Sequence, residues 1–144
     1  MQSKINDDEC ILRHQCHNRF YARREDFFLP ASIIIDLAYH EKISIYVSSL
    51  TFVNAYYILG RTYKIDSLLE KLESLAKLCH ITSVDESTIK GAFTCEGPDF
   101  EDMVQYMSAA AINPDVIITR NTKHFTGVPA KVMTPSDFLD GYIG

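Results

Sequence analysis

The chain has 144 residues, of which 47% are hydrophobic and 23% charged, with six glycines and five prolines. This composition indicates one compact domain spanning residues 1–144, and it excludes a fibrous or low-complexity chain. The net charge of −5 argues against a broad cationic surface for nucleic acid, while the four cysteines and the lack of a secretory signal or membrane-length apolar run predict a cytoplasmic protein.

The N-terminal segment is atypical. Residues 1–24 show no sustained periodicity, and only Lys4-Ile5 and Ile11-Leu12 hint at a strand and at the start of a helix. From Ala31 onward, segments with helical spacing of apolar residues alternate with short runs of β-branched residues. This alternation predicts βα units and a parallel sheet.

The first clear elements follow Pro30. A helix is expected from Ala31 to about Glu41, followed by a buried strand over residues 43–47. Ser48 or Ser49 is suited to cap the next helix, which runs towards Gly60.

The middle of the chain predicts another helix, a strand and a short helix. The helix has an apolar stripe of Ile65, Leu68, Leu72 and Leu75, with Glu73 and Lys77 at i,i+4 on its polar side. Residues 80–84 read as a strand and residues 85–93 as a short helix.

The helix that follows carries the most informative acids. Its expected apolar stripe consists of Phe100, Val104, Met107 and Ala111. Asp99 and Asp102 lie three residues apart near its N-terminus, where acids cap a helix and complement its dipole. Residue type and spacing alone therefore favour a capping role for both.

Three further elements complete the chain. Residues 116–119 are uninterruptedly apolar or β-branched, as expected of a strand covered on both faces. Residues 131–133 suggest a short strand, and Thr134-Pro135 followed by Asp137 predicts the start of a terminal helix.

With these elements placed, residues 24–139 resemble a PIN domain, the α/β nuclease fold of VapC-type toxins. Four segments carry the resemblance: Arg24-Glu25-Asp26-Phe27-Phe28, Tyr46-Val47-Ser48-Ser49-Leu50-Thr51, Asp99-Phe100-Glu101-Asp102-Met103-Val104-Gln105-Tyr106 and Ile117-Ile118-Thr119-Arg120-Asn121. The resemblance implies a three-layer αβα sandwich with a central parallel sheet.

The resemblance also implies a site of carboxylates that holds Mg²⁺ or Mn²⁺. Asp102 and Asp99 match the acidic helix start, and Asp7 would be the aspartate that ends the first strand. Asn54 stands where the family commonly carries a glutamate, and Asn121 where it commonly carries an acid. An asparagine still offers a carbonyl oxygen to a hard cation, but each replacement removes a negative charge.

His124 precedes Phe125 at a position where many relatives have an aspartate. No motif in the sequence supports a His–Asp or Ser–His catalytic pair. Taken alone, Asp7 is most simply part of a solvated acidic turn, and Asn54 and Asn121 are polar residues that bond neighbouring loops.

The resemblance implies that the chain hydrolyses RNA with a metal ion. It also implies the toxin of a toxin–antitoxin pair, with an antitoxin protein as partner, and a homodimer. The alternative is a catalytically weakened PIN-like module that binds a protein or RNA partner, which the two asparagines and the atypical N-terminus favour. A receiver-like fold is disfavoured, because no aspartate follows the strand at Tyr46-Val47.

Overall fold

The computed structural model describes residues 9–12 and 25–143. Its centre is a five-stranded sheet in the order β3-β2-β1-β4-β5, in which every pairing is parallel. The strands are β1 (Glu9–Leu12), β2 (Ser44–Ser48), β3 (His80–Thr82), β4 (Val116–Ile118) and β5 (Val132–Met133). The predicted parallel α/β sheet is confirmed.

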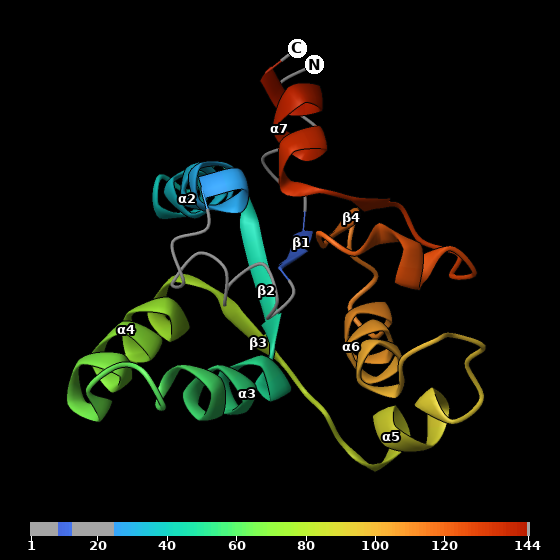
Figure 1. Ribbon diagram of the computed structural model, residues 1–144. Coiled ribbons are helices and arrows are strands. Elements are labelled where there is room, and N and C mark those ends of the chain that lie inside the picture. The colour runs from blue at the N-terminus through green and yellow to red at the C-terminus, as the bar shows by residue number, and fades with distance from the viewer. Residues whose placement is uncertain (1–8, 13–24, 144) are drawn as a thin grey trace.

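Helices cover both faces of this sheet. They are α2 (Glu25–Tyr39), α3 (Ser49–Leu59), α4 (Ile65–Leu78), α5 (Glu86–Ala92), α6 (Phe100–Ala110), the short 3₁₀ helix η2 (Thr122–Phe125) and α7 (Pro135–Ile143). In Figure 1, α2 lies near α7 at the top, α3 and α4 form a hairpin, and α5 lies below α6. The expected three-layer αβα sandwich is therefore present.

Alternation along the strands explains the layers, because successive side chains of a strand point to opposite faces. Val116 and Ile118 of β4 belong to a core cluster with residues of α2, α4 and α7. Ile117, between them, packs instead with Ala109 of α6. A strand that is apolar at every position thus serves two cores at once.

Local capping signals place several helices where the sequence predicts them. Ser48 is the N-cap of α3 and its side chain accepts a hydrogen bond from Thr51 N, while Gly60 is the C-cap. Asp85 caps α5 through a capping box with Thr88. The terminal helix begins at Pro135, and its first turn is bonded to the Thr134 hydroxyl.

Two predictions near the N-terminus are wrong. Ile11-Leu12 is part of strand β1 and does not start a helix. Helix α2 begins at Glu25, so Pro30 lies inside it. Pro30 is the sixth residue of α2, so it removes one backbone hydrogen bond of the helix and crowds the carbonyl group of the preceding turn.

The predicted apolar stripe of α6 is only partly correct. Val104 is buried, but Phe100 is 48% exposed and Ala111 is exposed. The buried residues of the helix include Asp102, Gln105 and Ser108, which are polar. A helix that buries polar side chains needs partners for them, and these partners form the site described below.

No helix in the described part of the chain has the length and apolarity to cross a membrane.

Candidate functional site

The carboxyl ends of β2 and β4 meet the N-termini of α3 and α6 at one edge of the sheet. The chain passes directly from β2 into α3, and the loop after β4 leads into η2. Strand β1 lies between β2 and β4, so the order of strands reverses beside it. In open α/β sheets, ligands bind outside the carboxyl ends of the strands at such a reversal.

Asp102 is the most buried acid at this edge. Its side chain is 1% exposed, although it lies in the first turn of α6. Its Oδ2 atom is 2.5 Å from Nδ1 of His124, whose side chain is 38% exposed. With Asp102 ionised, its carboxylate can only accept, and His124 Nδ1 then donates this hydrogen bond. The sequence analysis did not anticipate this pair.

Asp99 caps the same helix. Its Oδ1 atom accepts a hydrogen bond of 2.9 Å from the backbone N of Asp102. The cap satisfies one of the free N–H groups of the first turn and places a negative charge at the positive end of the helix dipole. The capping interpretation of Asp99 is confirmed, and through this bond Asp99 also fixes the backbone of Asp102.

Asn54 brings a further acid to the site. Its Nδ2 donates to Oε1 of Glu101 at 3.2 Å, and both residues are half-buried. Glu101 was not singled out from the sequence, although it directly precedes Asp102. The contact joins α3 to the start of α6.

Asn121 lies in the loop that carries His124. It precedes η2, its backbone N donates to Thr119 Oγ1 at 3.1 Å, and its carbonyl accepts from His124 N at 3.0 Å. Asn121 therefore supports the turn that brings His124 to Asp102, as expected of a loop residue.

A buried polar network lies one helical turn behind Asp102. Ser48 Oγ donates to Gln105 Oε1 at 2.5 Å, and Gln105 Nε2 donates to Thr51 Oγ1 at 3.4 Å. All three side chains are at most 3% exposed. The network locks α3 onto α6 and so sets the distance between Asn54 and the acids.

The described residues supply an incomplete metal cage. Within 9–12 and 25–143, no group of three or more His, Cys, Asp or Glu side chains is placed to hold an ion. Asp7 lies outside the described residues, and it precedes β1 in the chain, whereas the resemblance implied an aspartate after the first strand. Mg²⁺ often needs only one or two protein carboxylates besides water and substrate oxygens, so the carboxylate of Asp102 has the donor chemistry for such an ion.

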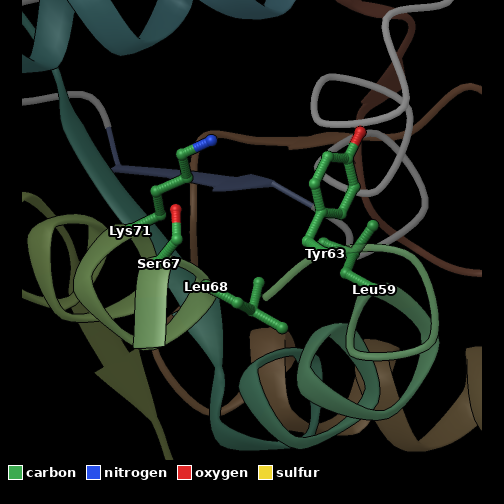
Figure 2. Close-up of a pocket in the computed structure, with 5 residues that line it drawn as sticks. All are labelled: Leu59, Tyr63, Ser67, Leu68 and Lys71. Carbon is green, nitrogen blue, oxygen red and sulfur yellow. The ribbon is translucent and has the colours of Figure 1, made fainter. Parts of the chain in front are cut away.

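A hollow between α3 and α4 lies away from these acids. It is lined by Leu59, Tyr63, Ser67, Leu68 and Lys71 (Figure 2). Its volume of about 10 Å³ is at the limit for one water molecule. We assign it to imperfect packing of the helical hairpin.

Comparison with known proteins gives a family and a fold. A family model described as PIN domain matches residues 20–123. No curated protein matches the sequence significantly.

Among solved structures, one chain of VapBC2 from Rickettsia felis, bound to a DNA fragment from the promoter, is similar with a TM-score of 0.62 at 16% identity, covering 88% of this chain and 98% of that chain. A chain of a toxin–antitoxin complex from Klebsiella pneumoniae has a TM-score of 0.64 at 15% identity, covering 88% and 97%. A chain of DNA-bound VapBC from Salmonella typhimurium has a TM-score of 0.63 at 14% identity, covering 89% and 98%. At these identities, the likeness concerns the fold.

Proposed function

The chain belongs to the PIN domain family, and on that premise we propose that it hydrolyses RNA phosphodiesters with a divalent cation, Mg²⁺ or Mn²⁺, at the carboxyl edge of its sheet. When bound, such a cation neutralises phosphate charge and lowers the pKa of the attacking water. The chain must supply oxygen donors and hold them in place.

The buried carboxylate of Asp102 carries this proposal. A charge that is 1% exposed is costly unless a partner of opposite charge or several hydrogen bonds compensate it. It lies beside the strand ends where a ligand site is expected, with Glu101, Asn54 and Asn121 on the elements around it.

We assign Asp102, Asp99 and Asp7 as the acidic ligands and the carbonyl oxygens of Asn54 and Asn121 as neutral ones. Asp99 has a second carboxylate oxygen besides the one in the cap. Asp7 is the third acid of the proposal, although it precedes β1 in the chain while the other ligands lie at the carboxyl ends of the strands.

The test is cleavage of a labelled RNA by the purified protein with MnCl₂, MgCl₂ or EDTA. We expect cleavage that requires the cation and that falls at least about 100-fold in Asp102→Asn, because the variant loses a charge at the reacting centre. Asp36→Asn is the matched control, since Asp36 is an exposed acid of α2 that also contacts a histidine. Full activity of Asp102→Asn, or cleavage unaffected by EDTA, would refute the proposal.

Two more variants test separately whether Asp7 and Asp99 are ligands of the cation. Asp7→Asn should reduce both Mn²⁺ affinity and cleavage if Asp7 is a ligand, and it should leave both unchanged if Asp7 belongs to a solvated turn. Asp99→Asn keeps a capping side chain, so a loss of activity without a loss of stability would support ligation.

A toxin role with an antitoxin partner is the second part of the proposal. One similar structure is described as a toxin–antitoxin complex and two as DNA-bound VapBC, which supports an antitoxin protein as the partner of this chain. A partner encoded beside this chain should co-purify with it and block cleavage. Independent activity in its presence would contradict this assignment.

A homodimer through the α3–α4 hairpin is the third part. Several large apolar side chains of the hairpin are exposed: Val53, Tyr57, Ile58, Ile65 and Leu69. Sedimentation should give a dimer for the native chain and a monomer for Tyr57→Glu. A monomeric native chain would refute it.

One observation favours the alternative of a weakened module. The imidazole of His124 already occupies Oδ2 of Asp102, at a position where relatives commonly have an acid. If the protein neither binds Mn²⁺ nor cleaves RNA, the module that binds a partner is the better assignment.

A further inference from the structure

His124 and Asp102 are unequally exposed, which decides which of them meets a ligand. The ring of His124 is 38% exposed and the side chain of Asp102 is 1% exposed. The imidazole therefore forms the outer part of the pair, and the carboxylate is behind it. A ligand arriving from solvent meets the ring first.

The hydrogen bond fixes which ring nitrogen is available. Nδ1 donates to Asp102 Oδ2, so the neutral ring carries its lone pair on Nε2. The described part of the chain offers this ring no second side-chain hydrogen bond. Histidines that bind metals almost always donate the other ring N–H to a carboxylate or carbonyl, which orients the ring and raises its basicity.

We propose that Nε2 of His124 is itself a ligand of the divalent cation, and that Asp102, besides its place among the acidic ligands, orients this ring through Oδ2. The inference rests on the proposed function and names the cation that the site takes. Mg²⁺ strongly prefers oxygen donors, whereas transition-metal ions accept imidazole nitrogen. The site is therefore selective for Mn²⁺ over Mg²⁺.

The chain contains a matched control for this pair. His40 Nδ1 lies 3.5 Å from Asp36 Oδ1 on α2, with side chains that are 57% and 69% exposed. The residue types are the same, but neither partner is buried, and the pair lies at the C-terminal end of helix α2 whereas His124 follows the carboxyl end of strand β4. Substitution of His40 therefore measures the effect of losing a histidine without losing the site.

The experiment is electron paramagnetic resonance of Mn²⁺ bound to the full, tag-free chain, with Mn²⁺ and Mg²⁺ affinities from calorimetry. We expect the spin-echo signal of the native protein to show coupling to an imidazole nitrogen. His124→Gln should lose this coupling and at least about tenfold in Mn²⁺ affinity, and His40→Gln should keep both.

Two further variants test the division of roles. His124→Asp restores an oxygen donor, so it should bind a cation without nitrogen coupling and with a lower ratio of Mn²⁺ to Mg²⁺ affinity. Asp102→Asn should keep the nitrogen coupling while the Mn²⁺ affinity falls by about 10–100-fold, as for the loss of a group that orients a ligand.

Failure of this inference differs from failure of the proposed function. Native protein that binds Mn²⁺ without nitrogen coupling, or an unchanged Mn²⁺ to Mg²⁺ ratio in His124→Asp, overturns the role of His124 while cation-dependent cleavage stands. Native protein that binds no Mn²⁺ overturns the role of His124, and EDTA-resistant or absent cleavage then separately overturns the function.

Discussion

Replacing Ser48 by alanine should destabilise the protein far more than the loss of one exposed hydroxyl. Ser48 Oγ accepts from Thr51 N at 3.3 Å as the N-cap of α3, and it donates to Gln105 Oε1 at 2.5 Å. Ser48 is 1% exposed and Gln105 is 3% exposed, so water cannot replace either bond. The variant loses a helix cap and a link between two helices in one step.

The expected loss is the sum of these two contributions. Removing a Ser cap costs about 1 kcal/mol. Removing the donor from a buried amide oxygen costs a further 1–3 kcal/mol, roughly. Urea denaturation followed by circular dichroism should therefore show a fall of about 2–4 kcal/mol in the free energy of unfolding.

A double-mutant cycle tests the reasoning directly. Gln105→Met removes the polar partner with little change in length, so Ser48→Ala should cost about 1 kcal/mol less in that background. Ser74→Ala is the control, because Ser74 is an exposed residue whose hydroxyl donates to the Glu70 carbonyl of its own helix, and its loss should change stability by under about 0.5 kcal/mol. A small loss for Ser48→Ala, or strict additivity with Gln105→Met, would show that the network does not hold α3 to α6.

Two further predictions concern the core. Ile118 is fully buried in β4 whereas Ile81 in edge strand β3 is 51% exposed, so Ile118→Ala should cost about 2–5 kcal/mol and Ile81→Ala much less; equal losses in urea denaturation would contradict this. Burial raises the pKa of the Cys79 thiol from 9.0 to about 11, so the neutral thiol stabilises the fold fully below pH 9 and this stabilisation is lost as the pH rises towards 11. The stability of the native protein relative to Cys79→Val should fall between about pH 9 and pH 11, because the thiol ionises in the unfolded chain while it stays neutral in the folded one; a constant difference would show that folding does not raise the pKa of the thiol.

Elements with strong local signals could be predicted from the sequence. The caps at Ser48 and Thr134 act within three residues, so they are visible in the sequence and placed the starts of two helices. The apolar run at Val116–Ile118 likewise predicted a strand covered on both faces.

Features that depend on distant partners could not be predicted. Strand β1 has only four residues, and it is defined by pairing with β2 on one side and β4 on the other. The contact between His124 and Asp102 spans 22 residues of chain, and that between Asn54 and Glu101 spans 47. The resemblance to the family motif identified Asp102 and Asn54 as candidate site residues. Only the fold shows that their hydrogen-bond partners are His124 and Glu101.

The central position of β1 limits how the chain can be shortened. The family match begins at residue 20, eight residues after β1 ends at Leu12. A fragment cut at that boundary would divide the sheet into the pairs β3-β2 and β4-β5, each with a newly exposed inner edge. Two-stranded sheets are marginal in water, and bare strand edges pair with other chains. Expression of the apparent family core alone should therefore yield aggregate, and a usable fragment must keep residues 9–12.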